Sequence, residues 1–189
     1  PEFSRRDEAA QKRYFDTIVA GFSLLVMVVG AGAYFLAPFI LGKFFPVFAQ
    51  ESLTELTHLT RILLLQAILL GFSNIAAAVT QFKHRYALYA ASPIVYNLGI
   101  IIGALWLYPI FGLQGLVWGV VIGAALHFGI QVPSAIRDGF FTRIPRIRES
   151  RAFLGTVRLS LPRALALSMN QLAFFGLLSL AGALSAGSI

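Results

Sequence analysis

The sequence predicts an all-α membrane protein, a polytopic transmembrane helical bundle with about five spanning helices. Only 12% of the 189 residues are charged, 58% are hydrophobic and the mean hydropathy is +0.78, whereas about a quarter of the residues of a soluble domain are charged. The apolar residues are gathered in runs long enough to cross a hydrocarbon layer about 30 Å thick, which takes roughly 20 helical residues. The basic residues, in turn, are concentrated in alternate connections between these runs.

Each predicted span is an apolar run without Asp, Glu, Lys or Arg. We expect spans near residues 17–41, 62–82, 86–108, 110–136 and 164–189. These runs are apolar nearly all round, whereas a helix on the core of a soluble protein would show a polar face. Because the pattern recurs along the chain, it is not a signal peptide. No run alternates with the two-residue period of a transmembrane β-barrel.

The distribution of charge predicts the orientation of the spans. Of the 15 Lys and Arg residues, only Lys43 and Arg61 lie in the connections after the first and third spans, and the other 13 lie before the first span, in the turn at 83–85 or in the stretch 137–163. The positive-inside rule therefore places the amino end and these two connections in the cytoplasm. The net charge of +7 reflects orientation and anionic lipid headgroups. We expect no nucleic-acid partner, since the aromatic residues lie within the spans and not among the charges.

The residue types that carry most enzyme and metal chemistry are missing or scattered. The chain has no cysteine, its three histidines have no metal-ligand spacing, and all eight acidic residues lie outside the predicted spans. No nucleophile and base pair, carboxylate pair or glycine-rich phosphate loop can be assembled from them. We therefore expect no catalytic residues, no bound metal and no cofactor, and a protein that is not an enzyme.

Polar and helix-breaking residues within the spans are the candidate functional positions. Freed backbone groups and amides are tolerated at membrane depth where protein or a wet cavity satisfies them. Pro38, Pro93 and Pro133 are therefore expected to mark kinks that face protein or water. The same argument favours interior positions for Asn74, Gln81, Asn97, His127, Gln131, Asn170 and Gln171. For each of them an interhelical hydrogen bond and a place on a substrate path both stay open.

Three further features indicate packing and topology. Gly115, Gly119 and Gly123 recur every four residues and predict a seam for close helix packing. Arg85 ends the short basic turn and is expected to act as a topology anchor or to stand at the mouth of a substrate path. The basic stretch 137–163 places Ile147, Phe153, Leu154, Val157 and Leu161 roughly on one helical face, which is typical of a helix in the membrane interface. Such a segment serves as a lipid-anchoring linker or as a hinge.

Five stretches follow one another along the chain: "LAPFIL", "LTRILL", "QFKHRYALYAASPIVYNLG", "GLVWGVVIGAALHFGIQVP" and "LPRALALSMNQLAFFGLLSLAGALSAGSI". In this order they resemble the MurJ/MviN family of lipid II flippases, within the superfamily of multidrug, oligosaccharidyl-lipid and polysaccharide exporters. The resemblance implies a two-lobed flippase fold, of which this chain is an interior fragment. Residues 1–136 would then belong to the N-terminal bundle, 137–163 would form a basic cytoplasmic interfacial linker, and 164–189 would be the first helix of the C-terminal bundle.

The function that this resemblance implies is transport for peptidoglycan synthesis. Lipid II, an undecaprenyl-diphosphate-linked disaccharide pentapeptide, would move from the inner to the outer leaflet of the bacterial cytoplasmic (inner) membrane by alternating access. Lipid II and membrane lipids are the implied partners. The family positions matched by Arg85, Asn97, Gln131, Pro133 and Gln171 imply helix shaping and interhelical hydrogen bonding.

Two alternative functions stay open, and one departure from the family pattern bears on the ion that would drive transport. A sibling exporter would move polysaccharide-lipid or drugs. A membrane scaffold without transport would tolerate Leu or Ala at the polar positions of the spans. Where this chain has Leu177, many members of the family that it resembles have an acidic or amide residue linked to a sodium site. An apolar side chain cannot ligate a hard cation. We therefore expect no sodium ligand at that position.

Overall fold

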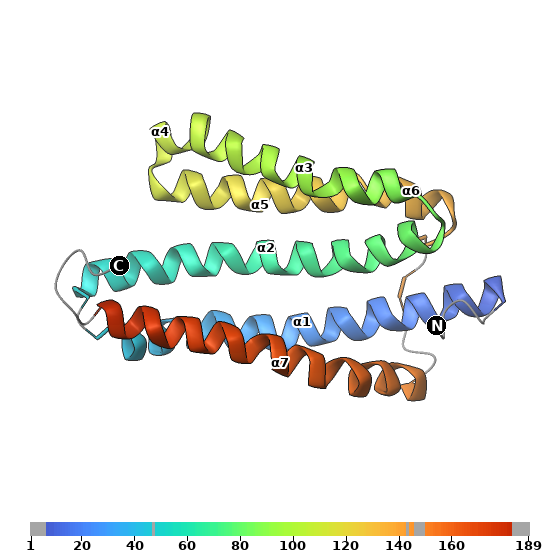
Figure 1. The fold of residues 1–189 in the computed structure, drawn as a ribbon, viewed down its shortest axis with the longest axis horizontal. Coiled ribbons are helices and arrows are strands. Elements are labelled where there is room, and N and C mark those ends of the chain that lie inside the picture. Colours follow the sequence, from blue (N-terminus) through green and yellow to red (C-terminus); the bar gives the residue numbers. More distant parts are fainter. Residues whose placement is uncertain (1–6, 47, 143, 146–149, 183–189) are drawn as a thin grey trace.

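A computed structural model describes residues 7–46, 48–142, 144–145 and 150–182 of the chain, and within them every regular element is helical. Figure 1 shows the elements in order along the chain. They are α1 (Glu8–Phe44), α2 (Gln50–Phe82), α3 (Tyr86–Ile102), the π-helical segment η2 (Gly103–Leu107), α4 (Tyr108–Phe111), α5 (Leu113–Gly129), α6 (Val132–Arg137) and α7 (Ser150–Gly182).

Four stretches of the described chain are long and apolar enough to cross a membrane. They are Glu8–Phe44, Gln50–Phe82, Tyr86–Phe111 and Leu113–Arg137, which confirms the predicted class, an all-α membrane bundle. The fifth expected span, 164–189, corresponds to the second half of α7, and residues 183–189 lie outside the described part. That span is not among the four that the described residues provide.

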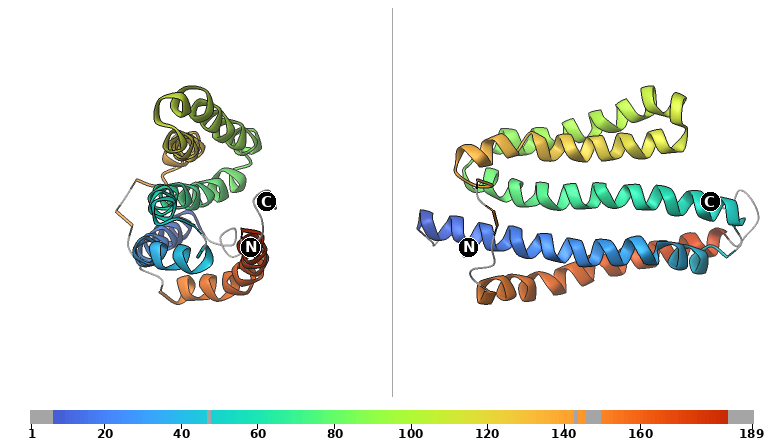
Figure 2. Two further views of the ribbon diagram at one scale, coloured as in Figure 1. Left: turned by 90° about the vertical axis from the view of Figure 1, so that its left-hand side faces the viewer. Right: turned by 180° about the vertical axis from the view of Figure 1, so that it is seen from behind.

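The helices run side by side in layers, as the views in Figures 1 and 2 show. The hairpin of α3 and α5 lies on one side of α2, α1 lies on the other side, and α7 follows along α1. The start of α1, the turn at 83–85 and the end of α6 lie together at one end of the bundle, which we call the basic end. The connections that the charge pattern groups on one side of the membrane are therefore together in space. At the opposite end lie the α1–α2 connection and α4.

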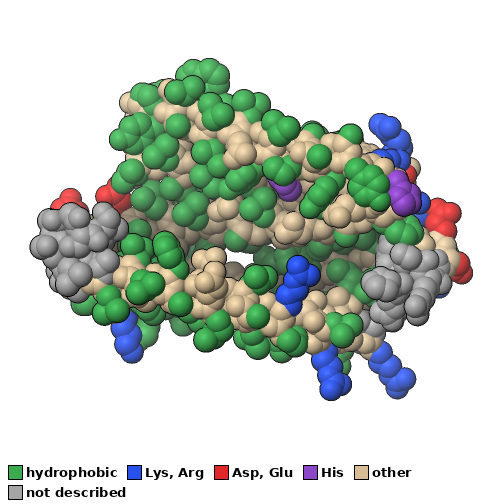
Figure 3. Space-filling model, in the orientation of Figure 1, with side chains coloured by type: hydrophobic (Ala, Val, Ile, Leu, Met, Phe, Trp, Pro, Cys, Tyr) green, Lys and Arg blue, Asp and Glu red, His purple; other side chains and the backbone are tan. Residues whose placement is uncertain are grey.

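Much of the surface is apolar, as a bilayer requires. Phe35, Ile94 and Trp106 are 73%, 71% and 65% exposed, and hydrophobic side chains cover the face drawn in Figure 3. An apolar surface of this extent would be a liability in water and is the ordinary exterior of a membrane bundle.

The first helix begins earlier than the predicted span near 17–41 because its amino end is well capped. The Asp7 carboxylate accepts a hydrogen bond from the Ala10 amide at 2.7 Å, and Lys12 pairs with Glu8 at 2.8 Å. An N-cap acceptor and a first-turn acid both stabilise a helix start. At 37 residues, α1 is about 55 Å long, so its ends extend beyond the hydrocarbon layer.

The short basic turn between α2 and α3 is a Schellman motif. The amide of Arg85 donates to the Thr80 carbonyl at 2.8 Å and that of His84 donates to the Gln81 carbonyl at 3.0 Å. His84 takes the left-handed conformation, with φ of 56°, that closes such a helix end. The predicted tight turn at 83–85 is therefore confirmed, and the motif satisfies carbonyls at the end of α2 that would otherwise stay unpaired.

The chain reverses at Gly112 and not at Pro109, where we expected the third span to end and the fourth to begin. Gly112 has φ of +60°, a conformation that glycine adopts without strain. Pro109 instead lies in the first turn of α4, directly after the π-helical segment η2. Proline cannot donate a helical hydrogen bond. The π-helical turn directly before it is a local adjustment that accommodates a proline in a spanning helix, so the helix continues past Pro109.

The last helix is continuous across the boundary drawn between linker and span. α7 runs unbroken from Ser150 to Gly182 with Pro162 inside it, so the boundary between residues 163 and 164 falls within a helix. Its amino end contacts α1 where Tyr14 and Thr156 share a hydrogen bond of 2.7 Å. Near the opposite end, the rings of Phe44 and Phe175 meet edge to face at 5.0 Å. Residue 147, expected on the apolar face of the linker, lies outside the described residues.

Candidate functional site

The closest helix contact in the described chain joins α5 to the continuous helix that α3 and η2 form. The predicted seam of Gly115, Gly119 and Gly123 lies on α5, and its partner stripe is Gly99 and Gly103. A Cβ at Gly103 would lie 2.6 Å from the Gly119 Cα, and one at Gly99 would overlap the Gly123 backbone. Backbones approach this closely in membranes only when small residues face each other. The seam is confirmed, and it fixes α3 against α5.

A buried polar cluster joins α2 to the end of α5. Gln131 is fully buried, and its Nε2 donates to the Ser73 Oγ at 2.9 Å and to the His127 carbonyl at 3.1 Å. The Ser73 Oγ lies 2.6 Å from the His127 Nδ1. The Ser73 Oγ also donates to the His127 carbonyl at 3.2 Å. Gln131 and His127 thus have the interior position that we expected, with interhelical hydrogen bonds.

A second contact extends this cluster across α3. The Gln66 amide of α2 donates to the Tyr96 hydroxyl at 3.2 Å, and the Tyr96 ring meets the His127 ring edge to face at 6.2 Å. Polar groups from three helices therefore lie along one internal line. The Gln131 Oε1 is buried without a hydrogen-bond partner among the described atoms.

Arg85 holds the turn between α2 and α3 to the end of α6. Its guanidinium donates to the Ser134 carbonyl at 3.1 Å and to the Ser134 hydroxyl, and it pairs with the Asp138 carboxylate at 2.9 Å. The side chains of Arg85 and Asp138 are 35% and 15% exposed, respectively. Asp138 thus has Arg85 as its ion-pair partner. Arg85 acts as an anchor between two connections of the basic end.

Next to this anchor an aromatic cluster closes the basic end. Gly139, with φ of +81°, turns the chain so that Phe140 enters the bundle, where it is 2% exposed. The Phe15 ring of α1 lies 4.9 Å from that of Phe140 and 4.8 Å from that of Phe141, edge to face in both cases. Val79 and Ala135 complete the core. The side chain of Phe140, near the start of the stretch 137–163, is therefore buried in the bundle.

A groove of about 710 Å³ runs between α1 and α2 toward the basic end. Tyr14, Phe15 and Phe22 form its α1 wall, and Gly71, Asn74 and Gln81 are on its α2 wall. Both amides are exposed. Gln81 bonds back to the Ala77 carbonyl at 3.3 Å, and Asn74 makes no hydrogen bond within the described chain. An exposed amide in a spanning helix is costly in lipid and marks a position for polar contact, so this groove is the candidate functional site.

The remaining predicted residues lie on the surface of the described chain, on three different helices. Pro93 and Asn97 are exposed on α3, Pro133 is exposed at the start of α6, and Asn170 and Gln171 are exposed on α7. We expected interior positions for the three amides, and within the described chain they face outward. The structure brings Gln131 together with Ser73 and His127 but brings none of these five residues to that cluster.

Some functional positions were not identified from the sequence. Ser73 was overlooked because a serine within an apolar run is common, although Asn74 beside it was named. Gly99 and Gly103 have the same four-residue spacing as the named seam, and that spacing is the signal that could have found them. Nothing local singles out Phe140, whose burial is decided by the Gly139 turn. Among the described residues, no three His, Asp or Glu side chains are grouped as a metal site would need.

Comparison with known proteins agrees with the resemblance. The family described as "Lipid II flippase MurJ" matches residues 1–189. A probable lipid II flippase MurJ of Borreliella burgdorferi is 26% identical over 149 residues, which cover 74% of this chain and 28% of that protein. The chain thus spans little more than a quarter of the length of this curated relative. Since the family match extends over the whole chain, this protein belongs to the MurJ lipid II flippase family.

Proposed function

We propose that this chain is part of a flippase that moves lipid II from the inner to the outer leaflet of the bacterial cytoplasmic membrane. The observation that carries this proposal is the family match over residues 1–189, with a relative whose name states the same activity. The transported headgroup, a diphosphate with sugars and a peptide, cannot cross hydrocarbon unaided. A carrier must therefore offer it a polar surface while the polyprenyl chain stays in lipid.

The groove between α1 and α2 supports this function chemically. It joins an apolar wall to the exposed amides of Asn74 and Gln81 within two candidate spans. Neutral amides can hydrogen-bond sugar and peptide groups without binding them so strongly that release is slow. The cations that would meet the diphosphate are not part of this groove, and we assign them to parts of the protein outside this chain.

The packing supports movement by alternating access. α2, α3 and α5 are joined by the glycine seam and the polar cluster, and such a unit moves as one body. α7 is exposed along most of its length and contacts α1 mainly near its ends. In this proposal residues 1–136 belong to one lobe, 137–163 connect the lobes, and α7 begins the second lobe.

The proposal includes an orientation. The basic end would face the cytoplasm, because the start of α1, the turn at 83–85 and the end of α6 lie together there and carry described cations, namely Lys12, Arg13, Lys83, Arg85 and Arg137. Arg85 and Asp138 would then stabilise the cytoplasmic closure of α2, α3 and α6. Membrane lipids would contact the apolar exterior.

Reconstitution of the full natural polypeptide tests the proposal. Liposomes would carry fluorescent lipid II, and a membrane-impermeant reagent would report how much reaches the far leaflet. We expect transport, with a reduction of about tenfold in Asn74→Leu, as for a lost polar contact of roughly 1.4 kcal/mol. Gln114→Leu is the matched control, since Gln114 is an exposed amide of α5 outside the groove.

Each alternative predicts a different result. A sibling exporter would leave lipid II in place and move a polysaccharide-lipid or a drug in the same liposomes. A scaffold would move none of these substrates, and Asn74→Leu would leave its function in cells unchanged. Equal transport by Asn74→Leu and wild type would reject the groove as part of the path.

A further inference from the structure

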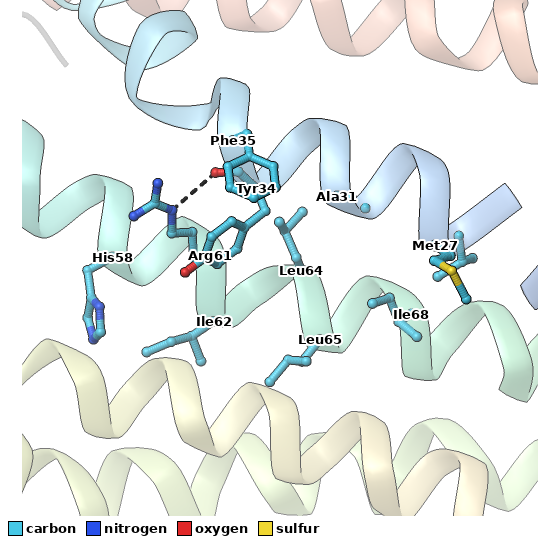
Figure 4. Close-up of a pocket in the computed structure, with 12 residues that line it drawn as sticks. Met27, Ala31, Tyr34, Phe35, His58, Arg61, Ile62, Leu64, Leu65 and Ile68 are labelled. Carbon is cyan, nitrogen blue, oxygen red and sulfur yellow. Dashed lines mark hydrogen bonds between the residues drawn. The ribbon is translucent and has the colours of Figure 1, made fainter. Parts of the chain in front are cut away.

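A second groove between α1 and α2, toward the end opposite the basic end, has a different chemistry. Its volume is about 630 Å³, and its walls include Met27, Tyr34, Leu65 and Ile68. Figure 4 shows Arg61 at one end of this apolar lining, beside Tyr34. We call it the Arg61 groove. It holds one of the only two cations that the sequence places away from the basic stretches.

The guanidinium of Arg61 is held in place by α1. Its Nε donates to the Tyr34 carbonyl at 3.1 Å, and its carbon lies 4.4 Å from the centre of the Tyr34 ring. Both contacts leave the two terminal nitrogens available, and among the described residues no carboxylate pairs with them. A planar, fixed guanidinium with two free donors matches a phosphate oxygen pair.

The depth of the groove fits a lipid. Arg61 directly precedes the apolar run 62–82, so its charge is at the boundary of the hydrocarbon layer. Ile68 lies seven residues further along α2, about 10 Å deeper in the layer at 1.5 Å per residue. The groove therefore joins a phosphate-binding group at the interface to an apolar channel that points into the bilayer.

We propose that the Arg61 groove binds one anionic glycerophospholipid of the surrounding bilayer, of the phosphatidylglycerol type. Its phosphodiester lies on the Arg61 guanidinium, and one acyl chain lies along Met27, Leu65 and Ile68. A single cation complements the single charge of a phosphodiester. A polyprenyl diphosphate with its large headgroup would call for more cations than the one in this groove. The bound lipid fills the space between α1 and α2 and stabilises their separation.

Native mass spectrometry of the full natural polypeptide in mild detergent tests this site. Phosphatidylglycerol is the probe, and phosphatidylethanolamine is the comparison lipid with no net charge. We expect one retained phosphatidylglycerol, with occupancy lower by about fivefold in Arg61→Gln, as for the loss of one interfacial cation. Leu65→Trp, which fills the channel without changing the charge, is expected to lower it similarly. Lys43→Gln is the matched control, because Lys43 is exposed and outside the groove.

The variants separate the possible outcomes. If Lys43→Gln lowers occupancy as much as Arg61→Gln, the lipid is held by general charge and the proposal fails. If Leu65→Trp leaves occupancy unchanged, the acyl chain is not in the groove and the proposal also fails. Displacement of the bound lipid by a polyprenyl diphosphate alone would overturn the assigned occupant. None of these results depends on transport, so the proposal can fail while the proposed function stands.

Discussion

The regions on the two sides of α2, the hairpin of α3 and α5 and the interface with α1, both contain closely spaced glycines and are packed in opposite ways. On one side, Gly99 and Gly103 face the α5 glycines so closely that a single Cβ would overlap backbone. On the other side, Gly30 has only one atom as close as 4.0 Å to an added Cβ, Gly32 has none within 4 Å, and two grooves separate α1 from α2. Gly30 and Gly32 therefore do not bring two helix backbones close together in the described chain.

The difference shows that two helix backbones approach most closely where two stripes of small residues face each other. Gly119 has Gly103 opposite it, whereas Gly30 is opposite the long side chain of Ile68. The buried polar cluster lies on the same side as the matched stripes. One side of α2 is therefore suited to stay fixed, and the other is suited to open or to hold a ligand.

The largest effect is expected from Gly103→Leu, which would break the close side. The new side chain would meet the Gly119 backbone, which cannot move aside, and we expect a loss of about 3 kcal/mol of unfolding free energy. Gly32→Leu adds the same side chain where nothing lies within 4 Å and should be neutral or slightly stabilising. Unfolding of the full natural polypeptide in detergent by titration with SDS measures both. Equal losses would show that the two sides do not differ.

Phe140→Ala sharpens the comparison at the basic end. Phe140 is 2% exposed and packs on Phe15, so its removal should cost about 3 kcal/mol. Phe175→Ala is the control on the loose side, since Phe175 is half-buried and contacts Phe44 and Phe45 edge to face. There we expect about 1 kcal/mol. Thermal unfolding measures the stability of both variants. A lower stability of Phe175→Ala than of Phe140→Ala would contradict this ranking.

The smallest effect is expected from Gln131→Met, which keeps the side-chain length and removes the amide. The loss of two buried hydrogen bonds should cost about 1–2 kcal/mol. Gln171→Met, at an exposed amide of α7, should stay within about 0.5 kcal/mol. A double-mutant cycle with Ser73→Ala measures whether Gln131 acts through Ser73. Additive losses in that cycle would show that the cluster is not a coupled unit.

Much of the fold followed from local chemistry. The spans, the turn at 83–85 and the α5 seam were predictable because charge and small-residue spacing are properties of neighbouring positions. The predicted helix ends were less accurate. The Asp7 cap starts α1 earlier than expected, and the chain reverses at Gly112 and not at Pro109. Of the candidate residues in the described part of the chain, Gln131, His127 and Arg85 lie in contacts that join helices.

The sequence by itself determined that this protein is a helical membrane bundle, because a bilayer about 30 Å thick admits few other solutions for such apolar runs. It also determined which connections lie at the basic end, since charge alone groups them. Only the tertiary structure decided that Gly103 meets Gly119, that Ser73 joins His127 and Gln131, and that Phe140 closes the basic end. Those contacts join residues far apart in the chain, and their geometry depends on how whole helices pack.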